Sequence, residues 1–329
     1  MADFDKTIVI DPNSQSQDKE VCPVCGMVLQ EDPSQRGYLC CMACNFRKKQ
    51  TIVLTPGSIV GNKYKLLNYL NSGGCGDLFL CCPLDDMSQR YVLKVMKSHD
   101  SASQSRFHRE AVILSSIRNP RIAAVLDHWS ADTESYIIME YIKGKNLKEV
   151  YDFYSIDEAT ALQLIQEVAL ALQYIWENFA IIHRDIKPEN IMLNDDLQVK
   201  LLDFGLSKQV GSSTMTDVTS ERTGLGTPGY MSPEQFLNSR DVDFRADIYS
   251  LGATLFFLLT GYKPINGTTN REVYEDTLKN SPPPALLLEL KCSSECIDLI
   301  QFMMQAKVED RPSSYGVLLE RIARLLNRS

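Results

Sequence analysis

The sequence predicts an α+β protein in which a small strand-rich region precedes a larger helical region, with a cysteine-rich segment ahead of both. Apolar residues flank a glycine-rich turn within residues 64–95 and indicate short strands. From position 107 onward, apolar residues recur at helical spacing. Two Cys-x-x-Cys pairs lie within residues 22–44.

Composition and charge are those of an ordinary globular protein. The chain has 329 residues, of which 44% are hydrophobic and 23% charged, and its length favours about two domains. A net charge of -8 argues against binding to nucleic acid or to an anionic membrane, because both require a basic field. No apolar run reaches the roughly 18 residues of a transmembrane helix, and the N-terminus lacks a signal-peptide pattern. We therefore expect a cytoplasmic protein with no membrane segment.

Local composition divides the chain into four parts. Residues 1–19 are polar and acidic and are expected to form a flexible tail. Residues 20–49 contain the Cys-x-x-Cys pairs, and residues 50–61, which include a Pro-Gly pair, are expected to be a linker. The remaining domain is expected to span residues 62–327.

The expected strands and helices of this domain follow from its apolar residues. Three apolar stretches with intervening turn residues predict strands near residues 66–70, 78–80 and 91–95. Two stretches with helical periodicity predict helices near residues 107–117 and 162–175.

The most specific motif lies in the second half of the chain. Residues 183–190 read H-R-D-I-K-P-E-N, and D-F-G follows at residues 203–205, thirteen positions after the Asn. This order and spacing resemble the protein kinase family. The resemblance implies a bilobal fold with a small β-rich N-lobe and a large α-helical C-lobe. It also implies transfer of the ATP γ-phosphate to protein substrates, and the Lys in the motif is similar to that of serine/threonine rather than tyrosine kinases.

The resemblance assigns catalytic and metal-binding roles to four residues of these motifs. Asp185 is expected to be the catalytic base that orients the substrate hydroxyl, and Lys187 to stabilise the transferred phosphoryl group. Asn190 and Asp203 are expected to hold Mg²⁺ (or Mn²⁺), which neutralises charge on the phosphates.

The same resemblance predicts the ATP site. Residues 70–78 are similar to the glycine-rich loop that covers the phosphates, with Asn71 in place of its first glycine. Lys94, in V-L-K-V, is expected to bind the α- and β-phosphates with Glu110 as its acidic partner. By alignment with the family, Met139 is the gatekeeper residue. The remaining ATP-binding residues are expected to be Leu70, Gly73, Gly76 and Leu78 in the loop, Glu140 and Ile142 in the hinge, and Met192 beneath the adenine.

Residues 203–234 resemble a kinase activation segment. Its end, G-T-P-G-Y-M-S-P-E, looks most like bacterial eukaryotic-type kinases, with Ser232 in place of the usual Ala. The resemblance implies a buried ion pair between Glu234 and Arg311, and a bracing role for Asp247 beneath the catalytic loop.

Seven hydroxyl residues of this segment are candidates for activating autophosphorylation. A phosphate there is expected to pair with Arg184 and order the loop. The candidates are Ser212, Ser213, Thr214, Thr216, Thr219, Ser220 and Thr223.

The cysteine-rich segment predicts a structural zinc ribbon. Cys22 and Cys25 form one Cys-x-x-Cys pair, Cys41 and Cys44 the other, and fifteen residues separate the pairs. Two such turns can place four thiolates around Zn²⁺, and no His lies in the segment to suggest a catalytic site. The adjacent Cys40 remains an alternative to Cys41 as ligand, and a redox dithiol is the alternative to zinc.

A short motif occurs on both sides of this segment. Thr7 and Thr51 each begin a Thr-Ile-Val sequence with an aliphatic residue at the third position after the Thr. This pattern resembles phosphothreonine motifs that forkhead-associated domains read, so such a domain is an expected partner. Two short strand-forming segments are the alternative explanation.

The leading interpretation is a cytoplasmic serine/threonine protein kinase with an N-terminal zinc ribbon. The altered glycine-rich loop leaves a pseudokinase as one alternative, and a zinc-dependent scaffold or adaptor is another.

Overall fold

The structure is a computed structural model, and it describes eleven stretches of the chain. These are residues 21–31, 38–44, 47–49, 54–73, 76–97, 101–131, 134–202, 228–237, 242–265, 270–279 and 292–327. The chain forms two compact units, of which one comprises Met1–Asn71 with Leu78–Tyr91 and the other comprises Ser72–Asp77 with Val92–Ser329. The predicted tail and most of the predicted activation segment lie outside the described residues.

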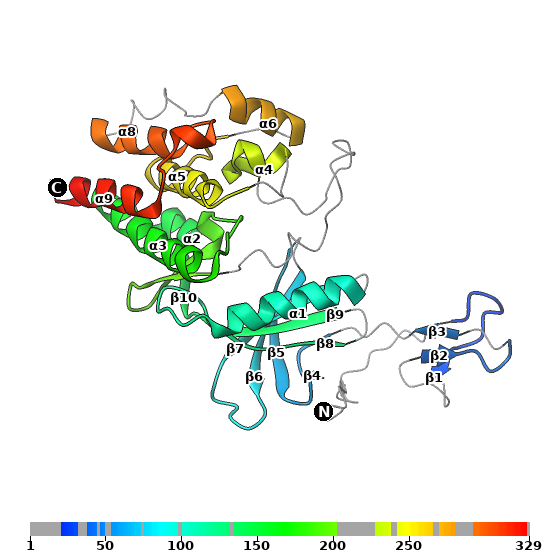
Figure 1. Cartoon of the computed structure of the whole chain (residues 1–329). Coiled ribbons are helices and arrows are strands. Elements are labelled where there is room, and N and C mark those ends of the chain that lie inside the picture. The colour runs from blue at the N-terminus through cyan, green and yellow to red at the C-terminus, as the bar shows by residue number, and fades with distance from the viewer. Residues whose placement is uncertain are drawn as a thin grey trace. The chain divides into compact units, whose positions relative to one another are not determined.

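A small antiparallel sheet carries the cysteine-rich segment (Figure 1). Its strands are β1 (Gln30–Glu31), β2 (Tyr38–Cys40) and β3 (Arg47–Lys49), in the order β1-β2-β3. Among the described residues of this segment, Cys22, Leu29 and Cys41 form a buried cluster, and Cys40 is also buried. A segment of this size has little hydrophobic stabilisation of its own and usually needs a metal or disulfides to fold.

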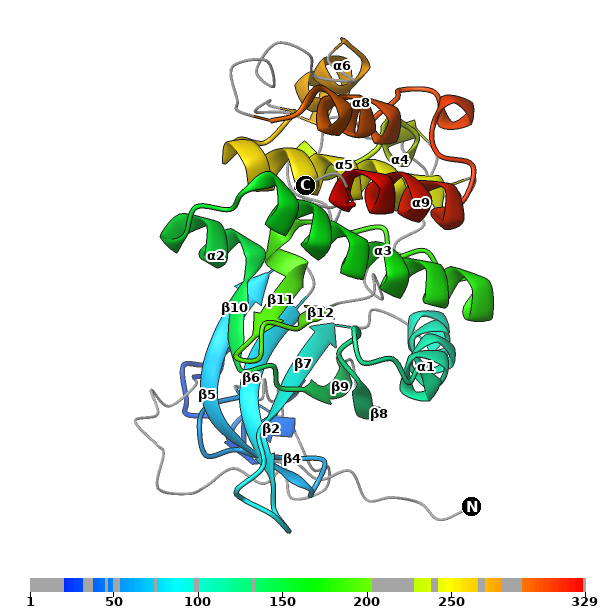
Figure 2. The same ribbon diagram turned by 90° about the vertical axis from the view of Figure 1, so that its left-hand side faces the viewer.

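A six-stranded sheet follows, in the order β4-β5-β6-β7-β9-β8. The three strands predicted from apolar stretches are present and extend beyond the predicted limits. The strands are β4 (Ile59–Val60), β5 (Tyr64–Gly73), β6 (Gly76–Pro83), β7 (Tyr91–Lys97), β8 (Val125–Ala131) and β9 (Glu134–Glu140). Helix α1 (Ser101–Ser116) packs against β8 and β9 (Figure 2), so the chain leaves the sheet after β7 and returns along its edge.

The rest of the chain is mainly helical, as the sequence predicts. The helices are α2 (Leu147–Phe153), α3 (Glu158–Phe179), α4 (Pro233–Leu237), α5 (Arg245–Thr260), α6 (Asn270–Lys279), α8 (Ser294–Met303) and α9 (Tyr315–Leu326). A second small sheet, β10 (Gly144–Asn146), β11 (Ile191–Asn194) and β12 (Val199–Leu201), is antiparallel throughout. Helix α3 packs against both α5 and α9, and α5 also packs against α8 (Figure 2). Among the described residues, no helix has the length and apolar character needed to cross a membrane.

The helix ends show why the chain turns where it does. The side chain of Asp157 accepts the backbone N–H of Thr160 and starts α3, and Ala180 ends that helix in the left-handed conformation. Helix α5 is buried on nearly all sides, in keeping with its apolar run, and forms the centre of the helical core.

The predicted buried ion pair is confirmed. Arg311 is 2% exposed, and its Nη1 and Nη2 bind the two carboxylate oxygens of Glu234 at 2.7 and 2.8 Å. The remaining guanidinium donors bind backbone carbonyls of residues 245, 305 and 306. Because each N–H of this buried cation has an acceptor, the desolvation cost of the charge is offset.

Replacing Arg311 with Met is therefore expected to destabilise the fold strongly. The change leaves Glu234 and several carbonyls without their donor, which typically costs about 3–5 kcal/mol. Urea unfolding followed by circular dichroism measures the loss. Arg324→Met is the matched control, because Arg324 pairs with Glu320 on an exposed helix face and should contribute less than about 0.5 kcal/mol. Equal losses in the two variants would contradict the structural role of the pair.

Candidate active site

A buried carboxylate holds the predicted catalytic loop in place. Asp247, in the first turn of α5, is 1% exposed. Its Oδ2 accepts the backbone N–H of His183 at 2.7 Å, and its Oδ1 accepts that of Arg184 at 2.8 Å. Arg184 has a φ of 65°, in the left-handed region, and this allows two consecutive N–H groups to face one carboxylate. The predicted bracing role of Asp247 is confirmed.

His183 connects this loop to the end of β12. Its Nε2 lies 2.7 Å from the backbone oxygen of Leu202, which can only accept a hydrogen bond. The proton therefore resides on Nε2, and Nδ1 accepts the backbone N–H of Asp185 at 3.3 Å. The imidazole thus positions Asp185 and Leu202, the residue directly before Asp203, on the same scaffold.

The structure brings together three of the predicted catalytic and metal-binding residues. The Lys187 Nζ lies 3.2 Å from Asp185 Oδ2. Asn190 Nδ2 donates to the same Oδ2 at 2.9 Å and to the backbone oxygen of Asp185 at 2.8 Å. Because the amide nitrogen of Asn190 faces Asp185, its amide oxygen points away from that residue. The loop thus holds one cation (Lys187), one amide (Asn190) and one carboxylate (Asp185). These are the groups that phosphoryl transfer needs.

The oxygen atoms that this loop offers as ligands fit a magnesium ion. Mg²⁺ prefers carboxylate and amide oxygens, and the side chain of Asn190 offers such an oxygen. The backbone oxygen of Asn190 also accepts the N–H of Leu202 at 2.9 Å, which places Leu202, the residue before D-F-G, beside the loop. Asp203 itself lies outside the described residues.

Lys94, predicted to bind the phosphates, and Glu110, its predicted acidic partner, lie on separate elements. Lys94 is in β7 and is 3% exposed, whereas Glu110 is in α1 and half-buried. A lysine so far removed from water is unusual unless a neighbouring group matches its charge. Their pairing remains a prediction.

The acidic side chain of the predicted hinge, Glu140, is bound within the protein. Glu140 Oε1 binds Lys200 Nζ at 2.8 Å, and its Oε2 accepts the backbone N–H of Ala124 at 3.1 Å. The carboxylate is thus committed to protein contacts, and the backbone N–H of Glu140 donates to the backbone oxygen of Ala124 at 2.9 Å. Binding of a nucleotide by the backbone of residues 140–142 remains a prediction. Ile142 is 8% exposed, and Met192 in β11 is half-buried.

The glycine-rich loop shows one clear requirement for glycine. Gly76 has a φ of 121°, and a Cβ there would lie 2.0 Å from the backbone oxygen of Val95. Gly73 ends β5, and the two residues between these glycines lie outside the described residues. Leu70 is exposed on β5, and Leu78 is half-buried on β6.

Gln235 is a site residue that the sequence reasoning missed. Its Nε2 donates to the backbone oxygen of Arg184 at 3.1 Å. Its Oε1 accepts the backbone N–H and the hydroxyl of Ser232, each at 3.1 Å. The end of the activation segment is therefore bonded to the residue before Asp185. The signal in the sequence was the Gln that follows S-P-E, together with the replacement of Ala by Ser232.

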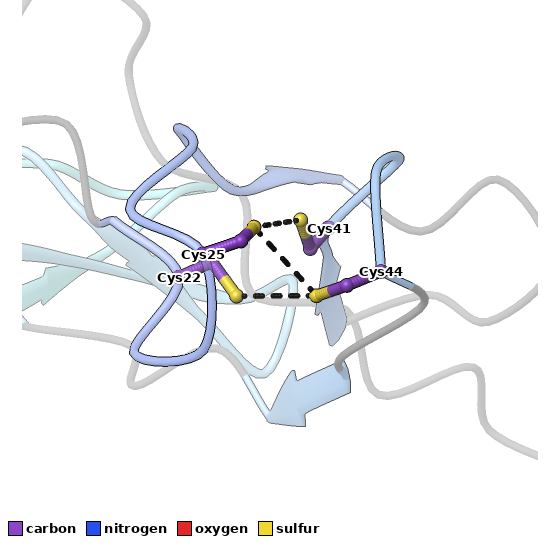
Figure 3. Close-up of side chains that lie close together, drawn as sticks. All are labelled: Cys22, Cys25, Cys41 and Cys44. Carbon is purple, nitrogen blue, oxygen red and sulfur yellow. Dashed lines mark hydrogen bonds between the residues drawn. The ribbon is translucent and has the colours of Figure 1, made fainter.

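Four cysteines of the small sheet converge (Figure 3). Sγ–Sγ distances are 3.5 Å for Cys22–Cys44, 3.4 Å for Cys25–Cys41 and 3.7 Å for Cys25–Cys44. Four sulfurs bound tetrahedrally to Zn²⁺ at about 2.3 Å lie about 3.8 Å apart, so this arrangement fits the ion.

Backbone N–H groups support thiolate ligands in this cluster. Val24 N donates to Cys22 Sγ at 3.4 Å. Hydrogen bonding from the backbone of Cys44 lowers the pKa of Cys41 to about 6, whereas the pKa of its hydrogen-bonded neighbour Cys25 is raised. The Cys40 sulfur instead lies 3.9 Å from the sulfur of Met42, outside the group of four.

Comparison with known proteins identifies the family. A protein kinase domain model matches residues 64–322. A probable serine/threonine-protein kinase of Clostridium perfringens is 32% identical over 272 residues, which cover 82% of this chain and 38% of that protein. Serine/threonine-protein kinase PknB of Mycobacterium leprae is 31% identical over 282 residues, covering 83% of this chain and 44% of that protein. The chain belongs to the protein kinase family, and these relatives are serine/threonine kinases.

A solved structure agrees with the fold. The kinase domain of Mycobacterium tuberculosis PknI aligns with a TM-score of 0.64 at 22% identity, covering 84% of this chain and 100% of that one. The predicted protein kinase fold is therefore confirmed. The chain spans less than half the length of the two curated relatives named above. A kinase domain implies use of ATP and Mg²⁺.

Gln235→Ala is expected to lower kcat for phosphoryl transfer by about tenfold. The change removes the donor to Arg184 and leaves buried groups of Ser232 unpaired, a loss of about 1–3 kcal/mol, and each 1.4 kcal/mol in a barrier is tenfold in rate. Steady-state kinetics should show the KM for ATP nearly unchanged. Ser232→Ala is the control, because it keeps the bond between Gln235 and Arg184. An unchanged kcat in Gln235→Ala would contradict the positioning role.

Proposed function

We propose that this chain is a serine/threonine protein kinase that transfers the γ-phosphoryl group of ATP to Ser and Thr hydroxyls of protein substrates. The observation that carries the proposal is the cluster of Asp185, Lys187 and Asn190 on a loop held by Asp247. Pre-organised groups of this kind supply most of the catalysis in phosphoryl transfer, because the reaction needs positioning and charge stabilisation.

Each residue of the cluster has a distinct role in this proposal. Asp185 orients the substrate hydroxyl and accepts its proton, and Lys187 stabilises charge on the transferred group. Asn190 and Asp203 hold Mg²⁺ (or Mn²⁺), which neutralises phosphate charge when it is bound. Lys94, paired with Glu110, binds the α- and β-phosphates.

The remaining ATP-binding residues enclose the nucleotide in this proposal. Gly73 and Gly76 allow the backbone of the loop to approach the phosphates, and Leu70 and Leu78 flank that loop. The backbone of Glu140 and Ile142 binds the adenine, and Met192 lies beneath it. The finding that Glu140 commits its carboxylate elsewhere supports this backbone role.

We also propose that autophosphorylation of the activation segment raises activity. The seven hydroxyl residues between Ser212 and Thr223 lie outside the described residues, and Arg184 is the cation expected to receive the phosphate. The hydrogen bond from Gln235 to the backbone oxygen of Arg184 supports this proposal. It connects the end of the activation segment to the catalytic loop, so ordering of the segment is expected to stabilise the residue next to Asp185.

The test is the intact mass of the purified protein after incubation with Mg²⁺-ATP, beside Asp185→Asn. We expect phosphates on the wild type alone, because loss of the base typically costs 10²–10⁴-fold in rate. Peptide mapping then locates the sites, and a variant with all seven loop hydroxyls changed to Ala should lose activation. If the wild type phosphorylates neither itself nor a generic protein substrate, the kinase proposal fails and a pseudokinase or scaffold remains.

We further propose that Cys22, Cys25, Cys41 and Cys44 bind a structural Zn²⁺ in a ribbon at residues 20–49, joined to the kinase domain at 62–327 by the linker 50–61. Sulfur spacing near that of a tetrahedral site supports this proposal. Four thiolates need a reducing compartment, which supports the proposed cytoplasmic location.

Zinc analysis of two neighbouring cysteine variants tests the ribbon. Cys41→Ser should lose one equivalent of zinc per chain and expose residues 21–49 to proteolysis, because the metal supplies most of the folding energy of so small a segment. Cys40→Ser, one position away, should keep its zinc. Mass spectrometry of metal content decides, and loss of zinc from Cys40→Ser with retention in Cys41→Ser would refute this ligand set.

Finally, we propose that phosphorylated Thr7 or Thr51 binds a forkhead-associated domain. Both residues lie outside the described residues, and the repeated Thr-Ile-Val motif supports the idea. Immobilised peptides around Thr7 should retain such a domain only when phosphorylated. Replacement of Ile10, the third residue after Thr7, is expected to weaken retention. Equal recovery on phosphorylated and unphosphorylated peptides would disprove the interaction.

A further inference from the structure

Two thiols and a carboxylate meet at the start of α8, in a group separate from the four ribbon cysteines and from the catalytic loop. The group consists of Cys292, Cys296 and Glu158. One potential ligand atom from each residue lies within 4.8 Å of the other two. Cys296 is fully buried, whereas Cys292 and Glu158 are half-buried, so the group is reachable from one side.

Local folding explains why these residues meet. Ser293 caps α8, and its Oγ accepts the backbone N–H of Cys296 at 3.1 Å. The cap places Cys292 just before the helix and Cys296 in its first turn. Both thiols therefore lie on the side of the helix that faces the start of α3, where Glu158 occupies the first helical position.

Ser293 also fixes the orientation of the carboxylate. Its backbone N–H donates to Glu158 Oε2 at 2.7 Å, and its hydroxyl donates to Glu158 Oε1. Each carboxylate oxygen has a second lone pair that these bonds leave available. Carboxylates that bind metals are commonly held by such outer hydrogen bonds.

These hydrogen bonds join Glu158 to Ser293, and weaker contacts hold the thiols. The side chains of Cys292 and Cys296 hydrogen-bond to each other. Cys292 Sγ also lies 3.7 Å from the backbone oxygen of Ser293, and thiols are weak donors and acceptors. Two sulfurs and an oxygen arranged around a common point match the ligands that Zn²⁺ accepts. Zn–S distances of about 2.3 Å and Zn–O distances of about 2.0–2.2 Å require ligand atoms about 3.5–3.8 Å apart, which small side-chain rotations would reach.

We propose that Cys292, Cys296 and Glu158 form a second Zn²⁺ site, which ties the start of α8 to the start of α3. Binding replaces two S–H bonds with two Zn–S bonds and releases both protons to solvent, so the occupied site carries a net charge of about -1. Three protein ligands leave the fourth position to water. The site is independent of kinase activity, and its expected effect is on the stability of the helical region.

Zinc content of full-length protein tests this proposal. Protein is purified with a phosphine reductant, saturated with ZnCl₂ and passed through gel filtration, and zinc per chain is measured by plasma mass spectrometry. We expect two equivalents for the wild type and one for Cys292→Ala/Cys296→Ala. Cys81→Ala/Cys82→Ala is the matched control, because it also removes two buried thiols, and it should keep two equivalents.

A variant without the ribbon ligands isolates the new site. With Cys22, Cys25, Cys41 and Cys44 all changed to Ser, one equivalent should remain, and zinc should raise the melting temperature of the kinase region. Adding Ser293→Ala to that background should weaken zinc affinity by about 10–100-fold, because Glu158 Oε1 loses the hydroxyl that orients it.

Two results would overturn the second site. The first is a ribbon-free variant that retains no zinc while its circular dichroism shows folded helices. The second is a Cys292–Cys296 disulfide in non-reducing peptide maps of protein that holds only the ribbon zinc. Either result is compatible with an active kinase, so the outcome does not depend on the proposed catalytic function.

Discussion

The buried carboxylate of Asp247 is the constraint on which the catalytic loop depends. A charge that is 1% exposed is costly unless polar groups surround it, and the N–H groups of His183 and Arg184 supply that compensation. The same two bonds favour the left-handed backbone of Arg184, which an arginine rarely adopts without such support. Burial and the charge of Asp247 raise the pKa of the Tyr315 hydroxyl, so that neighbour stays neutral. The bonds that compensate this one buried charge therefore fix the backbone conformation directly before Asp185.

Helix α4 extends this constraint to the end of the activation segment. Two adjacent residues of this short helix bind different parts of the fold, with Glu234 bound to Arg311 and Gln235 bound to the carbonyl of Arg184. Arg311 in turn binds the backbone of Arg245, in the helix that carries Asp247. The segment end, the catalytic loop and α5 therefore share one network of buried polar contacts. Because buried networks are costly when partly satisfied, a change at one member is expected to disturb the others.

The sequence predicted the residues of the site that belong to short, recognisable motifs. The resemblance of residues 183–190 to a kinase motif selected Asp185, Lys187 and Asn190, which the structure brings together. The same resemblance selected Asp247 and the partner of Glu234. The contacts that it missed join positions far apart in the chain. Gln235 and Arg184 are separated by 51 positions, and Ser293 and Glu158 by 135. Periodicity reports which face of an element is buried, but it does not report which partner a polar side chain meets across the fold.

The choice between Cys40 and Cys41 shows the same limit at the scale of one residue. Only Cys41 forms a Cys-x-x-Cys pair with Cys44, but Cys40 lies one position before it, so the sequence alone left the ligand open. The register of the small sheet separates them, because Cys40 is the last residue of β2 and pairs with Gln30 on one side and Arg47 on the other. Successive side chains of a strand point to opposite faces, so the residue at the end of β2 and its neighbour diverge. Cys40 turns toward Met42, and Cys41 turns toward Cys25. Strand register, a non-local property, thus selects the proposed metal ligand.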